Sequence, residues 1–190
     1  ARVAFGSVVA ETLGADYHVT AVSGIGLVRN YSDMYDARPM PEVYDSEYLQ
    51  VMGSRAYDHE LFHPDAILIV LGTNDFSPGD NPPEDPRPSM VVADYVDAYV
   101  AFVDKHLETH PMAQVFAVGR AMLTNGWPNA TDTFRTDLED ALTAVEEHYV
   151  SAGETRVHKF LIDKVPGAGC GTHPSVQEHA LTAEAVEPFV

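Results

Sequence analysis

The stretch Ala66-Ile67-Leu68-Ile69-Val70-Leu71-Gly72-Thr73-Asn74-Asp75 decides the fold of this 190-residue chain. Its first six residues are all apolar, which is typical of a strand that is buried on both faces of a covered parallel sheet. The strand then ends in a Gly-Thr-Asn-Asp turn. In α/β proteins the residues that follow the carboxyl ends of parallel strands form the ligand site. The stretch therefore predicts a parallel sheet with the Asn74 amide at its functional edge.

Strand and helix patterns alternate along the rest of the chain. Short apolar or β-branched runs predict three further strands, at Tyr17–Val22, Val115–Gly119 and Val157–Ile162. Helical patterns cover Val3–Leu13, Ser46–Arg55, Ser89–His106, a segment capped by Thr131 or Asp132 and ended by Gly153, and a last segment capped by Ser175. Five prolines predict a surface loop from Pro78 to Pro88. Four strands joined by helices predict a three-layer, doubly wound α/β domain with a parallel sheet.

The composition excludes several classes of function. The chain is long enough for one domain, and its 29 acidic and 11 basic residues give a formal charge of −18. Such a charge repels nucleic acids and anionic membranes, so neither is expected as a partner. No apolar run reaches the roughly 18 residues of a membrane span. Cys170 is the single cysteine, and no His-Cys cluster has metal-ligand spacing, so no metal or organic cofactor is expected.

Three motifs together carry a family resemblance. They are Ser23-Gly24-Ile25-Gly26-Leu27-Val28-Arg29-Asn30-Tyr31, Gly72-Thr73-Asn74-Asp75 and His173-Pro174-Ser175. In this order they resemble the SGNH, or GDSL-like, hydrolases. The Ser-Gly-x-Gly-x-x-Arg-Asn segment is most similar to carbohydrate esterase family two, whose members deacetylate plant polysaccharides. The resemblance implies a flavodoxin-like sheet, no cofactor and no metal, and it makes residues 1–190 an SGNH hydrolase domain.

The resemblance also implies roles for three residues. Ester hydrolysis needs a nucleophile, a base and donors to the oxyanion. By their motif positions, Gly24 would donate its backbone N–H, Asn74 its side-chain amide, and His173 would be the base. Many relatives carry an Asp three residues before the His, but Cys170 occupies that position here. Family-two esterases often work with a Ser-His dyad, so the absence of Asp at position 170 favours this subfamily among the SGNH hydrolases.

The nucleophilic serine has two candidate positions. In one alignment Arg2–Phe5 is a strand and Ser7 attacks, although only 17 positions then separate Ser7 from Gly24. In the other, which we favour, Ala4–Leu13 is the helix before the second strand. The first strand and its Gly-Asp-Ser then lie upstream of residue 1. The 190 residues would be the C-terminal part of a longer polypeptide, in which family-two esterases carry a jelly-roll domain before the hydrolase domain.

Other residues have both a structural and a functional interpretation. Asp75 and Trp127 are candidate substrate-binding residues, since Trp127 follows a predicted strand and an indole can stack on a sugar. Equally, Asn74 and Asp75 could only form a turn, and Trp127 could be an exposed structural residue. The glycines at 24 and 26 could serve backbone geometry alone. Arg29 and Asn30 could anchor the loop or contact substrate.

The sequence therefore predicts a secreted or extracellular serine esterase that removes acetyl or other small acyl groups from carbohydrate. Its partners would be an acylated carbohydrate, or another small ester, and an N-terminal segment of the same precursor. Two alternatives remain open. One is a lipase or thioesterase of the same fold, which needs an apolar acyl groove. The other is a carbohydrate-binding module that lacks the nucleophile.

Overall fold

The computed structural model describes residues 3–33, 38–81, 84–119, 122–163 and 167–190. Within these residues one sheet has three parallel strands in the order β1-β2-β3. The strands are β1 (Ala66–Ile69), β2 (Gln114–Gly119) and β3 (Val157–Leu161). Val115 of the central strand lies opposite Ile67 on one side and Val157 on the other. The predicted strands around 66, 115 and 157 are thus confirmed.

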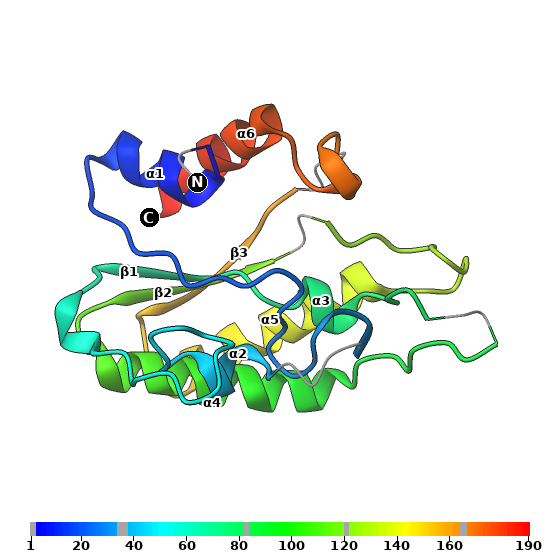
Figure 1. Ribbon diagram of the computed structural model, residues 1–190, viewed down its shortest axis with the longest axis horizontal. Helices are drawn as coiled ribbons and strands as arrows, with labels where there is room; N and C mark the ends of the chain where they lie inside the picture. Colours follow the sequence, from blue (N-terminus) through cyan, green and yellow to red (C-terminus); the bar gives the residue numbers. More distant parts are fainter. Residues whose placement is uncertain (1–2, 34–37, 82–83, 120–121, 164–166) are drawn as a thin grey trace.

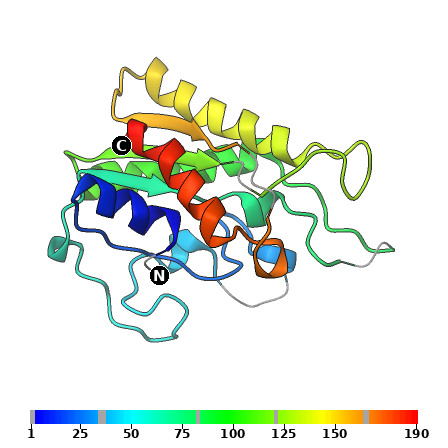
Figure 2. The same cartoon turned by 90° about the horizontal axis from the view of Figure 1, so that it is seen from above.

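Helices cover both faces of the sheet, as Figures 1 and 2 show. Two long helices pack on one face: α4 (Val92–Thr109) and α5 (Phe134–Ser151). Two shorter helices, α1 (Phe5–Leu13) and α6 (Val176–Val186), pack together above the other face. The short elements are α2 (Met40–Val43), α3 (Thr73–Phe76), η1 (Tyr31–Asp33), η2 (His59–Leu61), η3 (Cys170–Thr172) and η4 (Glu187–Phe189). The predicted three-layer α/β fold is confirmed.

Strand β2 shows why two helical layers form. Its alternate side chains point to opposite faces, and all are buried from Val115 to Gly119. Val115 and Ala117 join the large core beneath α4 and α5, whereas Phe116 and Val118 join the smaller core beneath α1 and α6. A strand that is apolar on both sides needs a cover on both sides, which these helices provide.

The predicted strand at Tyr17–Val22 is not formed in the structure. The segment has no regular secondary structure and pairs with no described strand. Tyr17 and Val19 are 47% and 64% exposed. The centroid of the His18 ring lies 5.3 Å from that of Tyr57 and 5.9 Å from that of Phe62. A β-rich sequence becomes a strand only when a neighbour satisfies its backbone groups. No described segment pairs with this one.

The helix predicted at Ser46–Arg55 is also wrong. These residues form consecutive turns closed by an isolated antiparallel bridge between Ser46 and Ala56. Gly53 has φ +73°, which a helix cannot contain. The nearest helix is instead the short α2, which ends before this segment.

Helix ends agree with the prediction in part. Gly14, with φ +66°, ends α1, and Ser175 begins α6 with its predicted side-chain cap. The N-cap of α5 is Thr133 rather than Thr131 or Asp132. The Asp132 carboxylate accepts from the Asn129 backbone N–H, so it organises the preceding turn instead of the helix. The predicted loop from 78 to 88 is confirmed where it is described, and Pro82 and Pro83 lie outside the described residues.

The structure decides between the two alignments of the N-terminal segment. Phe5–Leu13 is helical, so the strand that would place Ser7 at a nucleophile turn is not formed; Arg2 lies outside the described residues. Ser7 is 5% exposed, and its hydroxyl donates to the Ala4 carbonyl at 2.8 Å. A serine buried within a helix is poorly placed to attack a substrate. The assignment of this segment to a helix is therefore the correct one.

Candidate active site

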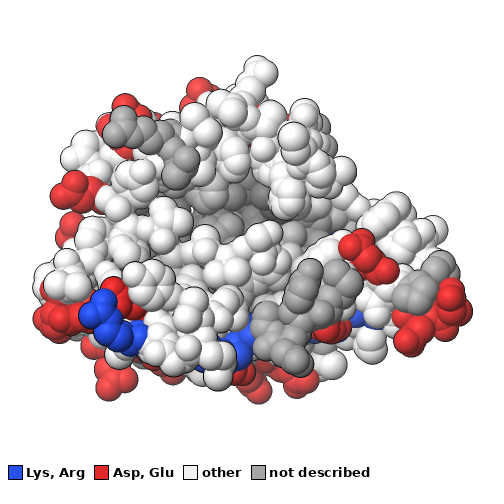
Figure 3. Space-filling view, viewed as in Figure 1, with Lys and Arg blue, Asp and Glu red and all other residues white. Residues whose placement is uncertain are grey.

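Three segments carry the predicted catalytic residues to one end of the molecule. The loop 23–31 contains Gly24, helix α3 follows β1 and contains Asn74, and the loop 167–175 precedes α6 and contains His173. Figure 1 shows α3 and the 167–175 loop at the end of the sheet to which the strands point. This is the edge at which α/β folds bind ligands. Figure 3 shows a hollow between the α1–α6 layer and the layer below it.

The two predicted oxyanion donors lie side by side. The Asn74 amide donates one hydrogen bond to the Ile25 carbonyl at 2.6 Å, which joins α3 to the residue after Gly24. Gly24 has φ +74°, and its carbonyl accepts from the Tyr31 N–H at 2.8 Å. Within the described residues the Gly24 N–H has no acceptor. The oxyanion roles of Gly24 and Asn74 stay predictions.

Asp75 holds the loop that carries Gly24. It is fully buried, and its carboxylate accepts from the backbone N–H groups of Leu27, Val28 and Arg29 at 2.7–3.0 Å. Charge-assisted bonds of this kind are stronger than neutral ones. The substrate contact predicted for Asp75 stays a prediction, and its burial favours a structural role.

Arg87 is a second buried group that joins these segments, and the sequence analysis did not identify it. Its side chain is fully buried and donates to the carbonyls of Asn30, Asn74 and Ser77 and to both carboxylate oxygens of Asp33. One guanidinium thus connects the end of the 23–31 loop with α3. No sequence pattern marks it, since it lies between two prolines in an irregular loop.

Two glycines in these motifs have physical reasons for their identity. A Cβ on Gly26 would lie 2.0 Å from the Arg29 carbonyl oxygen, so the loop closes only around a glycine. Gly72 has φ +110°, and its Cβ would meet Leu138 at 2.5 Å and the Tyr95 hydroxyl at 2.6 Å. The close approach of the backbone after β1 to α4 and α5 therefore needs glycine two positions before Asn74.

His173 stands at the end of a tightly folded loop. It is exposed. Its backbone carbonyl accepts from the Gly169 N–H at 2.8 Å, and its backbone N–H donates to the Cys170 carbonyl at 3.2 Å. Within the described residues its imidazole has no hydrogen-bond partner. Cys170, which occupies the position of the relatives' Asp, is exposed and is not paired with the ring. The Ser-His dyad without an orienting Asp stays a prediction.

Trp127 lies in the segment that connects the carboxyl end of β2 with α5. It is 62% exposed, and the loop around it is ordered by hydrogen bonds from Gly126 N–H to the Asp132 carbonyl and from Arg135 N–H to the Asn125 side chain. An exposed indole on a fixed loop can stack on a sugar ring. Its contact with substrate stays a prediction.

The charges of these segments follow from their contacts. The Arg87 guanidinium lowers the pKa of the Asp33 carboxyl through direct hydrogen bonds. Burial and the nearby Arg87 charge lower the pKa of Arg29. Hydrogen bonds from the backbone N–H groups of Ser175, Ala168 and Gly167 lower the pKa of Glu178. The carboxylates of Asp33 and Glu178 are thus ionised at neutral pH.

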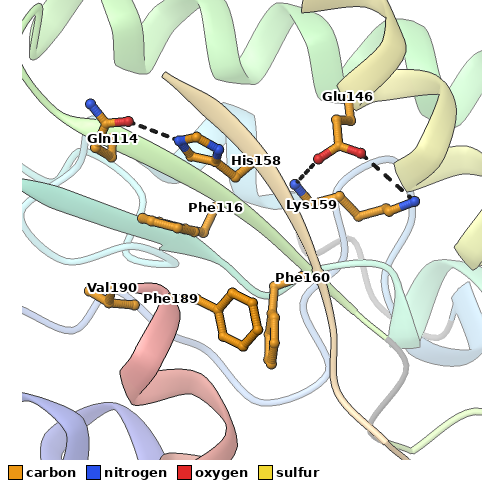
Figure 4. Close-up of a pocket in the computed structure, with 8 residues that line it drawn as sticks. All are labelled: Gln114, Phe116, Glu146, His158, Lys159, Phe160, Phe189 and Val190. Carbon is orange, nitrogen blue, oxygen red and sulfur yellow. Dashed lines mark hydrogen bonds and ion pairs between the residues drawn. The ribbon is translucent and has the colours of Figure 1, made fainter. Parts of the chain in front are cut away.

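A cavity of about 340 Å³ lies elsewhere, at the amino ends of β2 and β3 (Figure 4). Phe116, Phe160 and Phe189 form part of its wall, and Gln114 and His158 are hydrogen-bonded at its edge. It contains none of the predicted catalytic residues. Among the described residues, no cluster of His, Cys, Asp or Glu is arranged to hold a metal. None of the described helices has the length and apolar character to cross a membrane.

The chain is similar in sequence and in fold to known carbohydrate esterases. No family model matches the chain. It is 27% identical over 188 residues to an acetylxylan esterase / glucomannan deacetylase of Cellvibrio japonicus, covering 99% of this chain and 47% of that protein. A family two carbohydrate esterase structure from the same organism matches with 26% identity and a TM-score of 0.81, covering 99% of this chain and 50% of that one.

A third match shows the fold alone, because its identity is 24%. It is a family two carbohydrate esterase from Clostridium thermocellum in complex with cellohexaose, with a TM-score of 0.84 over 99% of this chain and 53% of that one. The fold is therefore that of the SGNH hydrolases. The curated relatives are acetylxylan esterases / glucomannan deacetylases, and the structural neighbours include family two carbohydrate esterases, which confirms the predicted resemblance. The chain spans about half the length of these relatives.

Proposed function

We propose that this chain is the C-terminal part of a serine esterase that removes acetyl or other small acyl groups from carbohydrate. The observation that carries the proposal is the Asn74–Ile25 hydrogen bond, since it sets the Asn74 amide beside Gly24 at the carboxyl end of the sheet. Acetylxylan esterases among the relatives support the acyl group and the carbohydrate substrate. The class of reaction is carboxylic ester hydrolysis.

In the proposed mechanism His173 accepts the proton of a serine hydroxyl while the serine oxygen attacks the ester carbonyl. The Gly24 N–H and the Asn74 amide stabilise the negative oxygen that forms. Collapse breaks the bond to the sugar oxygen, which takes the proton from His173 and leaves an acyl-serine. Water, deprotonated by the same imidazole, then releases the acid and restores the serine.

The serine in this proposal comes from sequence upstream of residue 1. Strand β1 lies at an edge of the described sheet, and residues 17–22, which have no regular secondary structure, pair with no described strand. Two apolar side chains of these segments are exposed: Val70, just after β1, at 45%, and Val19 at 64%. A further parallel strand between these two segments would satisfy both and would bring its carboxyl end to Gly24 and Asn74. The relatives, twice as long as this chain, have room for such a strand and for the proposed jelly-roll domain.

The substrate side of the proposal rests on Trp127 and on charge. A neutral sugar ring can stack on the exposed indole, and a chain of formal charge −18 disfavours anionic substrates. Polysaccharide substrates are encountered outside the cell, so we propose an extracellular location. Replacing Trp127 by Ala should raise KM for acetylated xylo-oligosaccharides and leave hydrolysis of 4-nitrophenyl acetate unchanged. Equal effects on both substrates would exclude a sugar contact.

The nucleophile can be located by labelling with a fluorophosphonate, a reagent that reacts with activated serines. The polypeptide that includes the upstream segment is labelled, digested and analysed by mass spectrometry. The proposal predicts one labelled serine upstream of residue 1 and none within residues 1–190. A label on Ser7 or on another serine of the chain would contradict it. Affinity for xylo-oligosaccharides without labelling or turnover would instead indicate a carbohydrate-binding module.

A further inference from the structure

Glu178 occupies an unusual place for a helix-capping residue. It lies in the first turn of α6 and is 5% exposed. Its carboxylate accepts the Ser175 N–H at 2.7 Å, while the Ser175 hydroxyl accepts the Glu178 N–H at 3.3 Å. This reciprocal pair is a capping box. A capping box by itself would leave much of the carboxylate free.

The remaining capacity of the carboxylate is used on the loop before the helix. One oxygen accepts the Gly167 N–H at 2.8 Å and the other accepts the Ala168 N–H at 2.9 Å. Glu178 therefore holds both ends of the 167–175 loop, since Ser175 lies at its far end. Within the described residues its partners are backbone N–H groups, with no lysine or arginine paired to it.

The backbone of the loop folds closely on itself between these two anchored ends. A Cβ on Gly167 would lie 2.3 Å from the Thr172 carbonyl oxygen, and one on Gly169 would lie 2.7 Å from that of His173. The Gly169 N–H donates to the same His173 carbonyl. The backbone of His173 is thus fixed by the segment that Glu178 holds.

We propose that Glu178 is the positioning residue for His173. The inference rests on the proposed function of His173 as the base. Because Cys170 leaves the imidazole without a side-chain carboxylate, the place of His173 depends on its backbone, and Glu178 fixes that backbone through three N–H groups. Asp75 does the same for the loop of Gly24 through Leu27, Val28 and Arg29. Each catalytic loop is held by one buried carboxylate from the helix that adjoins it.

The test replaces Glu178 by Gln, which keeps the shape but presents an NH₂ group to backbone donors. Two readouts need no substrate: hydrogen exchange of the Gly167 and Ala168 amides, and the ¹H–¹⁵N signals of the His173 ring. We expect faster exchange and shifted, broadened ring signals in Glu178→Gln. The matched control is Asp137→Asn, a carboxylate in the first turn of α5 that accepts from Thr133 and touches neither loop.

Turnover of 4-nitrophenyl acetate is the third readout. A misplacement of about 1 Å can cost about 10²-fold in rate, so we expect kcat to fall by about that factor with KM within about twofold, while Glu178→Asp, which keeps the charge, recovers part of it. A folded Glu178→Gln variant with unchanged ring signals and kcat would overturn the inference. If the parent protein hydrolyses no ester, the proposed function fails, and the exchange and ring signals still decide whether Glu178 positions His173.

Discussion

The side chain of Asn74 donates a hydrogen bond to the backbone carbonyl of Ile25 at 2.6 Å, across 49 positions of sequence. This contact fixes the orientation of the amide, because one of its two hydrogens is committed to the 23–31 loop. The bonded carbonyl belongs to the residue that follows Gly24. A pair of donors held in place before the substrate arrives is what stabilisation of an oxyanion requires.

Replacing Asn74 by Ala should therefore act on catalysis. Loss of one oxyanion donor typically costs about 10²–10³ in kcat. We expect a fall of this size for 4-nitrophenyl acetate, with KM little changed. Replacement of the nearby Thr73 by Ser, which keeps helix α3, serves as the control. If Asn74→Ala retains more than half of the parent kcat, Asn74 is not an oxyanion donor.

The Asp75 carboxylate should be a determinant of stability. In Asp75→Asn an amide NH₂ would face three backbone donors, and a buried unsatisfied group typically costs about 1–3 kcal/mol. We expect the free energy of unfolding in urea to fall by about 2–4 kcal/mol. Asp80→Asn, at an exposed carboxylate bonded to the Tyr31 hydroxyl, should change it by less than about 1 kcal/mol. A higher KM at unchanged stability would instead support the predicted substrate contact of Asp75.

Replacement of Arg87 by Lys should destabilise the fold, although lysine keeps the positive charge. An ammonium group cannot reproduce the planar fork that reaches three carbonyls and Asp33. The carbonyls of Asn30, Asn74 and Ser77 would lose their donor, and a buried unsatisfied group typically costs about 1–3 kcal/mol, so urea unfolding should show a loss in that range. The control is Arg55→Lys at the exposed pair with Glu47, where we expect little change. Equal losses in the two variants would exclude a special role for Arg87.

His106 gives the fold a defined dependence on pH. It is 3% exposed, and burial, with smaller contributions from His110 and Lys105, lowers its pKa from 6.5 to about 4. Between these values the unfolded chain binds a proton that the folded chain does not. The free energy of unfolding is therefore unaffected by protonation of His106 well above pH 6.5 and decreases as the pH falls towards 4. At pH 5 the loss is about 2 kcal/mol.

The measurement is urea unfolding at pH 7.5 and pH 5.0. The difference between the two pH values should be smaller in His106→Gln than in the parent. His63→Gln, at an exposed side chain, should leave the difference unchanged. The same pH dependence in the parent and in His106→Gln would show that other groups cause the acid destabilisation.

The sequence predicted the parts of this molecule that depend on local pattern. The apolar runs at β1, β2 and β3 and the Ser175 cap are encoded by neighbouring residues, and all four are confirmed. The 17–22 segment has an equally β-like sequence but is not a strand, because strand formation depends on a partner. A local pattern cannot report that partner.

The candidate site divides in the same way. Asn74 and His173 were found through motifs, whereas Arg87 acts through carbonyls that lie far away in sequence and leaves no pattern. Glu178 had a usable signal, since Ser175-x-x-Glu178 is a capping box in the sequence. Its contacts with Gly167 and Ala168, which give it a wider role, are visible only in the structure.

The most direct test of the central claim is acetate release from acetylated xylan by the polypeptide that includes the upstream segment, compared with its His173→Ala variant. A general base typically contributes about 10²–10⁴ in rate. The account predicts turnover in the parent and a loss of that size in a folded His173→Ala variant. Equal rates in the two proteins would contradict the assignment of His173 as the base, and no acetate release from the parent would contradict the proposed function.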